Sequence, residues 1–143
     1  MEFTIRQSRT DDEDAAALSA LMHESVHGVG ARGYSAEELA AWSPAPRDIE
    51  SARERFADQH IWLAEDAEGS CAFMTLKDTG YLDFAYALPR AAGRGAASAV
   101  YAALEVWALV EGLTLLTSDI SLVARPFFEK RGWQVLSRQD NDV

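Results

Sequence analysis

The sequence predicts an α/β fold with a mixed, mostly antiparallel central sheet of six or seven strands flanked by helices. Two observations carry this prediction. Residues 60–88 hold three β-like runs separated by short turns, which is typical of an antiparallel meander. Amphipathic helical segments precede the meander, and a long helix and a short apolar strand follow it. This order is typical of one sheet covered by helices on its faces.

The first half of the chain is predicted to hold one strand and up to three helices. Residues 2–7 alternate apolar and polar side chains, as a strand does. Residues 10–13 (TDDE) and 35–38 (SAEE) each have the spacing of a capping box and precede apolar side chains at helical spacing. Residues 46–58 could hold a third helix. The acidic run after residue 10 is thereby explained as a helix start, and we assign it no chemistry.

The meander has three predicted strands. Residues 60–65 (HIWLAE) and 71–76 (CAFMTL) are joined by a turn that contains Gly69. Residues 81–88 (YLDFAYAL) form the third strand, which Pro89 ends.

The second half of the chain is predicted to be a helix, a strand, a helix and a strand. A long helix runs from near Arg94 to Gly112, a natural C-cap. Residues 113–118 (LTLLTS) are largely apolar, which is consistent with an interior strand. Residues 123–131 indicate a short helix and residues 133–136 a last strand.

Length and composition indicate one globular domain over residues 1–143, with a formal net charge of −10. This charge argues against nucleic acid or an anionic membrane as the main partner. No apolar run reaches membrane-spanning length, and no signal-peptide core is present, so we expect a cytoplasmic protein. Cys71 is the single cysteine, and no Cys/His cluster has metal-ligand spacing, so we predict no metal site.

A glycine turn at residues 93–97 (GRGAA) separates the third meander strand from the long helix. Glycines let a backbone approach a ligand, and the free N–H groups of a helix start attract an anion. Small residues also serve close packing, so the local pattern leaves both uses open. The turn lacks the longer fingerprint of a dinucleotide-binding fold and the Gly-Lys-Ser/Thr of a Walker loop. Arg90 and Arg94 flank it.

Two spaced motifs resemble the Gcn5-related N-acetyltransferases, the GNAT family. In that family a strand ending near a proline leads into Gln/Arg-x-x-Gly-x-Gly/Ala and a long helix. Residues 92–97 (AGRGAA) resemble this signature, with Gly95 and Ala97 matching. Residues 121–133 (SLVARPFFEKRGW) are similar to the family's Ser-x-x-Ala-x-x-Phe-Tyr-Glu-Lys-x-Gly-Phe. The order of elements agrees over nearly the whole chain, so the resemblance implies the acyl-CoA N-acyltransferase type of sheet.

The resemblance implies an N-acetyltransferase that moves an acetyl group from acetyl-CoA directly to a primary amine of a small molecule or peptide. Residues 85–87 would pair with the pantetheine arm along a bulged strand splayed from the next, and residues 93–97 would hold the pyrophosphate. A strand N–H would polarise the acetyl carbonyl. No protein nucleophile is needed. The predicted cofactor contacts are Ala85, Tyr86, Ala87, Ala92, Gly93, Arg94, Gly95, Ala96, Ala97 and Ser121.

The chain departs from the family pattern at three places. Phe128 stands where the family often has a Tyr that acts as general acid, and Ala92 stands where Gln or Arg is usual. The sequence also stops soon after the sixth predicted strand, where the family continues into a seventh. A truncation, an unprotected sheet edge or a partner subunit, as in a homodimer, would each account for this. The alternative function is a catalytically degenerate acyl-CoA-binding or protein-interaction module of the same fold.

The candidate general base is Asp83, because family bases are often carboxylates on this strand. The alternative for Asp83 is a solvent-facing or structurally paired acid, and Asp119 is the second candidate. His27 and Tyr34 are predicted to border the acceptor. Trp42 could line the same site, and the core is the place that we favour for it. The overall acidity suits a cationic amine acceptor.

Overall fold

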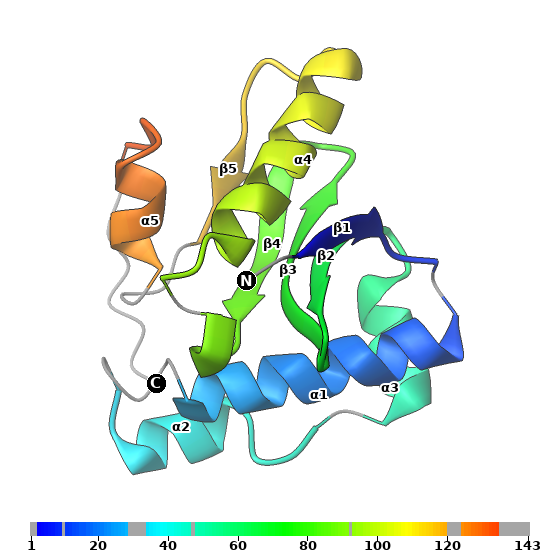
Figure 1. The fold of residues 1–143 in the computed structure, drawn as a ribbon, viewed down its shortest axis with the longest axis vertical. Coiled ribbons are helices and arrows are strands. Elements are labelled where there is room, and N and C mark those ends of the chain that lie inside the picture. The colour runs from blue at the N-terminus through cyan, green and yellow to red at the C-terminus, as the bar shows by residue number, and fades with distance from the viewer. Residues whose placement is uncertain are drawn as a thin grey trace.

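The computed structural model describes residues 3–9, 11–28, 34–46, 48–91, 93–119 and 124–134. Its elements are shown in Figure 1. In chain order they are β1 (Thr4–Gln7), α1 (Asp12–Gly28), α2 (Ala36–Trp42), α3 (Ile49–Phe56), β2 (Gln59–Asp66), β3 (Gly69–Lys77), β4 (Tyr81–Ala87), the 3₁₀ turn η2 (Pro89–Ala91), α4 (Ala96–Val110), β5 (Thr117–Ser118) and α5 (Arg125–Glu129).

The strands form one mixed sheet in the order β1-β2-β3-β4-β5. The pairs β1–β2, β2–β3 and β3–β4 are antiparallel, and β4–β5 is parallel. The predicted mixed, mostly antiparallel sheet is confirmed, with five strands in the described part of the chain rather than six or seven. Of the predicted sixth strand, Trp133 and Gln134 have no regular structure, and the remainder lies outside the described residues.

The prediction for residues 113–118 was wrong in extent, and the structure does not test their interior position, because most of the predicted next strand lies outside the described residues. Only Thr117 and Ser118 pair with β4, and β5 is the outermost strand that the structure describes. Leu113 and Leu116 pack against the core, whereas Leu115 is 67% exposed. The apolar run therefore lies in an irregular connection that packs one side against the core. Its composition alone does not distinguish such a connection from a buried strand.

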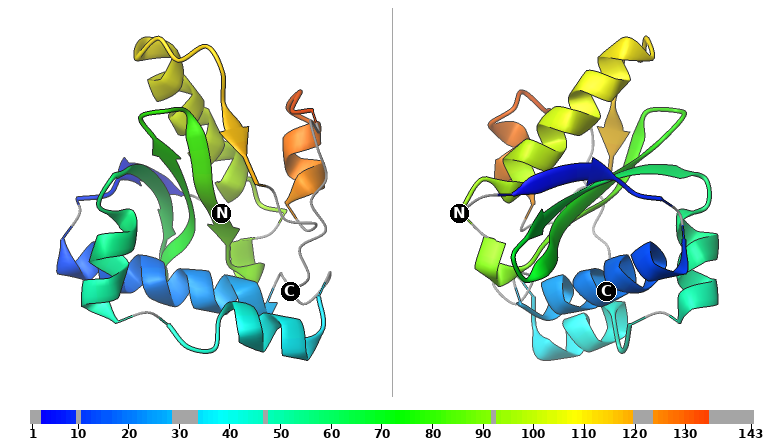
Figure 2. Two further views of the ribbon diagram at one scale, coloured as in Figure 1. Left: turned by 180° about the vertical axis from the view of Figure 1, so that it is seen from behind. Right: turned by 45° about the vertical axis from the view of Figure 1, so that its right-hand side comes forward.

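Helices cover both faces of the sheet, as Figure 2 shows. α1 lies on one face with α3 packed beside it, and α4 crosses the other face over β2 and β3. The core between these layers is apolar and includes the fully buried side chains of Leu18, Phe73, Val100 and Leu104. Within the described ranges, no helix is long and apolar enough to cross a membrane.

The helix starts follow the predicted signals, except that Asp11 is the residue that caps α1. The capping box of α2 is confirmed, because Ser35 and Glu38 exchange bonds between side chain and backbone. At α1 the side chain of Asp11 accepts the N–H of Asp14 at 2.8 Å, which satisfies one free donor of the first turn. Thr10, which the predicted box of α1 includes, lies outside the described residues.

Candidate cofactor and acceptor site

β4 carries a bulge at its centre. Between two ladder positions, one residue of β3, Thr75, faces two residues of β4, Asp83 and Phe84. The N–H of Phe84 donates to Thr75 Oγ1 at 3.0 Å instead of joining the ladder. Such a bulge bends a strand and re-aims its side chains. Arg55 contacts both Asp83 and the ring of Phe84, so both lie on the side of the sheet that α3 occupies.

The outer edge of β4 is open beyond its first two residues, because in the described residues β5 pairs only there. Leu88 donates its N–H to Cys71 O of β3 at 2.8 Å. Since strand residues alternate in the direction of their backbone groups, Ala85 and Ala87 turn theirs away from β3. The Ser25 hydroxyl accordingly donates to the outward Ala87 carbonyl at 2.8 Å. Among the described residues, the outward backbone groups of Ala85 and the N–H of Ala87 thus have no ladder partner.

The glycine turn after η2 is bare and left-handed. Gly93 and Gly95 have φ values of 74° and 89°, and a Cβ at either position would meet no atom within 4 Å. Gly95 caps α4 without a side-chain bond, and its carbonyl accepts the N–H of Ala99 at 3.0 Å. Ala96 is fully buried and Ala97 half-buried. No large side chain of the turn thus covers the first N–H groups of α4, and uncovered N–H groups at a helix start suit an anion.

Three arginines near this turn differ in their contacts. Arg131 donates through Nη2 to the hydroxyl of Ser98, which places a guanidinium beside the first turn of α4. Arg90 is held by Asp66 at 3.0 Å, and this bond lowers the pKa of the Asp66 carboxyl. Through this pair with Asp66, Arg90 ties η2 to the β2–β3 turn. Arg94 is exposed beside Gly95. Ala92 and Ser121, two further predicted contacts, lie outside the described residues.

Asp83 is a paired acid with little exposure. Its Oδ2 lies 2.9 Å from Arg55 Nη1 and accepts from Gln59 Nε2 at 2.8 Å, and its side chain is 11% exposed. Gln59 Oε1 is buried and has no hydrogen-bond partner in the described part of the chain. The second candidate base, Asp119, accepts the hydroxyl of Tyr81 at 2.9 Å, and burial raises the pKa of that phenol.

The predicted acceptor residues lie where the end of α1 meets α2. His27 Nε2 is 2.6 Å from the carbonyl oxygen of Ser43, just after α2. The rings of Tyr34 and Trp42 meet edge to face at 5.4 Å, and Trp42 lies 6.3 Å from Tyr86 of β4. We call Tyr34, Trp42 and Tyr86 the aromatic wall. The core prediction for Trp42 was wrong, because it is 38% exposed at the end of a two-turn helix that buries only Leu39.

Phe128 fills a closed aromatic cluster. Its side chain is 2% exposed, and its ring lies 5.9 Å from Tyr101, 5.1 Å from Phe127 and 5.1 Å from Trp133. Within the cluster Trp133 Nε1 donates to the hydroxyl of Tyr101 at 2.9 Å. Phe128 therefore packs α5 against α4, as a core residue does.

Arg55 and Gln59 are the contacts that sequence reasoning missed. They are 28 and 24 residues from Asp83 in the chain, and nothing in α3 or at the start of β2 marks them as its partners. Their approach depends on the bulge and on how α3 packs against the sheet. The one available signal was Asp83 itself, an acid inside an otherwise apolar strand.

Comparison with known proteins identifies the family of this chain. A family described as "Acetyltransferase (GNAT) domain" matches residues 31–142. The chain belongs to the GNAT family. Its relative in Escherichia coli K12 named YafP, an uncharacterised N-acetyltransferase, is 29% identical over 126 residues, which cover 88% of this chain and 79% of that protein.

Solved GNAT structures share the fold. A GCN5-related N-acetyltransferase from Rhodopseudomonas palustris superposes with a TM-score of 0.81 at 30% identity, covering 92% of this chain and 81% of that one. The PaiA N-acetyltransferase of Thermoplasma acidophilum, solved in complex with coenzyme A, superposes with a TM-score of 0.79 at 19% identity. The match covers 98% of this chain and 94% of that one. The predicted family and fold class are confirmed. Membership supports acetyl transfer in general, with acetyl-CoA as the donor that the family uses.

Proposed function

We propose that this GNAT domain, residues 1–143, transfers an acetyl group from acetyl-CoA directly to a primary amine of a small molecule or peptide. One observation carries the proposal. A strand with an open edge, β4, leads through η2 into a left-handed glycine turn at the start of a helix. The edge offers backbone groups of Ala85 and Ala87 to an amide-containing arm, and the turn offers N–H groups to phosphates.

The backbone supplies the main chemistry in this proposal. An outward N–H of β4 polarises the acetyl carbonyl, so that the tetrahedral oxyanion formed by amine attack is stabilised. Holding both substrates side by side in one site also reduces the entropic cost of the transfer step. The chain needs no nucleophilic side chain, which agrees with the full burial of Cys71 and with the burial that raises its thiol pKa.

Three proton transfers accompany the reaction. The acceptor ammonium must lose one proton before its neutral amine can attack, and the attacking nitrogen must lose a second as the tetrahedral intermediate collapses to the amide. Asp83 is the proposed base, either directly or through a water beside its ion pair with Arg55. The departing thiolate must gain one. Phe128 has no proton to donate, so in this proposal the proton comes from solvent.

The aromatic wall and His27 are the proposed boundary of the acceptor. Trp42 and Tyr86 offer flat apolar surface near the open edge of β4. A formal net charge of −10 favours a cationic amine over an anionic one at long range.

The test is release of free thiol from acetyl-CoA across a panel of primary amines, each paired with its alcohol. We expect at least one amine to accelerate release above the rate without acceptor, and the acetylated amine to appear in equal amount by mass spectrometry. Tight acetyl-CoA binding without acceleration by any amine would contradict transfer.

A second function is favoured by one observation. The buried ring of Phe128 leaves the family's frequent proton-donor position without a hydroxyl. A binding module that kept the fold and lost turnover would show this feature. It predicts cofactor affinity without thiol release, whereas absence of any cofactor affinity would contradict both functions.

A further inference from the structure

The side of α4 that faces away from the sheet is apolar. Val106 is 61% exposed, Leu109 71% and Val110 77%, and Ala102, one turn before Val106, is exposed as well. At helical spacing these four residues share one side of α4, opposite the side that is buried against the sheet. In Figures 1 and 2 no other described helix or strand lies across this side. We call Ala102, Val106, Leu109 and Val110 the outer stripe.

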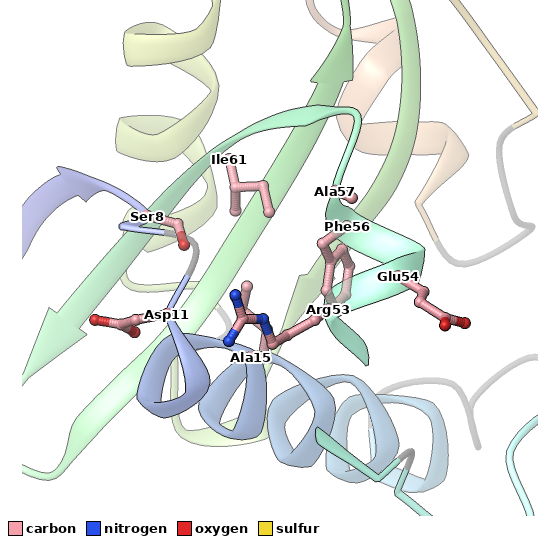
Figure 3. A pocket seen from close by; sticks show the side chains of 9 residues that line it. Ser8, Asp11, Ala15, Arg53, Glu54, Phe56, Ala57 and Ile61 are labelled. Carbon is pink, nitrogen blue, oxygen red and sulfur yellow. The ribbon is translucent and has the colours of Figure 1, made fainter. Parts of the chain in front are cut away.

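Exposed apolar side chains are concentrated at this end of α4. Of the six large apolar side chains that are well exposed in the described ranges, three belong to the outer stripe, and a fourth, Leu115, lies in the connection that follows α4. The hollow between α1 and α3, which Figure 3 shows from close by, is different, because the large apolar side chains that border it (Leu18, Phe56 and Ile61) are each 4% exposed or less. A contiguous exposed apolar patch marks an interaction surface.

The charge of the chain favours a second copy of itself as the partner at this surface. Glu105 is the one charged residue from Ala96 to Val110, so the outer stripe offers no charge of its own. A basic partner, which a formal net charge of −10 attracts, gains no ion pair there. Two copies of the acidic chain repel each other, and an uncharged face is where this repulsion opposes contact least.

The outer stripe is complementary to itself when two copies of α4 pack antiparallel. A two-fold axis through Val106 places each residue that follows it in one helix opposite the residue that precedes it by the same number of positions in the other. Val110 then rests on Ala102 of the second copy, and Leu109 rests on Ala103, so each large side chain meets a small one. The two Glu105 side chains lie on opposite sides of the axis and do not face each other.

The area of the outer stripe agrees with a weak dimer. Its three large side chains and the adjoining alanines expose on the order of 400 Å² per copy, since burial of one large apolar side chain removes roughly 100 Å² from water. Contact would thus bury a little less than about 1,000 Å² over both copies, which is near the lower limit for a specific interface. We therefore expect a dissociation constant on the order of 10–100 µM.

We propose that this chain forms a two-fold symmetric dimer through the outer stripe, with the two α4 helices antiparallel and Val106 on the axis. Complementary shape, absence of charge and exposed apolar area at one surface each favour this pairing. Val106 is about three turns from Gly95 along α4. A variant at Val106 should therefore lose the dimer and keep the glycine turn, which separates this proposal from the proposed enzymatic function.

The association is measured by sedimentation velocity of the full chain at concentrations from about 1 µM to 1 mM. We expect a reversible monomer–dimer equilibrium that tightens several-fold as the salt concentration rises, because salt screens the repulsion between two acidic copies. A monomer at every concentration would overturn the proposal. A dimer that dissociates when salt is added would overturn it as well, because charge would then hold the copies together.

Val106→Glu places two carboxylates face to face on the axis and should weaken the dimer at least about tenfold. Val106 is exposed, so the core is not disturbed, and urea unfolding checks this. The matched control Ile49→Glu adds the same charge at an exposed apolar position of α3 and should leave the dimer intact. An equal mixture of Val106→Glu and Val106→Lys should dimerise again, because position 106 then meets an opposite charge. Equal weakening by Val106→Glu and Ile49→Glu, or a mixture that stays monomeric, would refute this arrangement.

Discussion

Arg55 Nη1 lies 2.9 Å from Asp83 Oδ2, which joins the end of α3 to the bulge of β4. The same carboxylate oxygen accepts a second bond, from Gln59 Nε2 at 2.8 Å. The proposed base is thus also a structural partner, and the two roles require different experiments.

Asp83→Asn separates these roles. If Asp83 takes the proton of the amine, this variant should lose about 10²-fold or more in kcat while its affinity for acetyl-CoA stays the same. The control is Arg55→Gln, which breaks the same pair and leaves the carboxylate in place. Steady-state kinetics and urea unfolding are measured for both. Equal losses of kcat in the two variants, matched by equal losses of stability, would make Asp83 a purely structural acid.

Gly95→Glu tests the phosphate role of the glycine turn. The new carboxylate would project into open space in front of the first N–H groups of α4, so we expect coenzyme A binding to disappear. Gly112→Glu is the matched control, because Gly112 also has positive φ and open space, at the opposite end of α4. Both variants carry the left-handed backbone cost of about 1–2 kcal/mol. If a calorimetric titration shows that both variants bind coenzyme A equally, the glycine turn is not the phosphate-binding site.

Arg131→Gln tests the guanidinium beside Ser98. We expect the dissociation constant for coenzyme A to rise roughly three- to tenfold at low salt, and the difference to shrink at high salt, because exposed charges are screened. Arg125→Gln serves as control, since Arg125 begins α5, the helix just before Arg131, and pairs with Glu129 instead. A salt-independent loss in Arg131→Gln would indicate damaged packing on Phe127 in place of a lost charge.

The buried acid Asp14 makes stability depend on pH. Arg6 at 2.7 Å, the Arg9 N–H at 2.8 Å and the Ser8 hydroxyl stabilise its carboxylate and lower its pKa well below the ordinary 3.8. Because the folded pKa is the lower one, this stabilisation is fully present above about pH 4 and is lost as the pH falls further.

Asp14→Asn should therefore cost on the order of 3 kcal/mol at pH 7, since it leaves Arg6 without its buried partner. The cost should shrink as the pH falls below about 4, because the unfolded wild-type chain then binds a proton at Asp14 that the folded carboxylate does not. Urea unfolding at pH 7 and pH 3 measures both values. Parallel stability curves for the wild type and Asp14→Asn over this range would contradict the assignment.

Local signals in the sequence predicted many of the elements. The box at residues 35–38, the meander and the glycine before the long helix each depend on neighbouring residues, and each is confirmed. Residues 113–118 show where this reasoning fails. A run of apolar side chains indicates burial on one side, and it does not say whether the backbone joins a ladder.

The site depended on distant contacts. The sequence identified the position of Asp83 but not its partners, which arrive from α3 and β2. Of the two places that it left open for Trp42, it favoured the core, whereas this side chain is 38% exposed and meets Tyr34 and Tyr86.

The sequence by itself determined the family, the fold class and the position of the glycine turn, because motif spacing, hydrophobic period and glycine chemistry act over a few residues. Only the tertiary structure decided that Arg90 is committed to Asp66, that Arg131 lies beside α4, and that Asp83 is held by Arg55. A charged side chain takes the partner that packing brings within hydrogen-bond distance, and that distance is set by how strands and helices from remote parts of the chain come together.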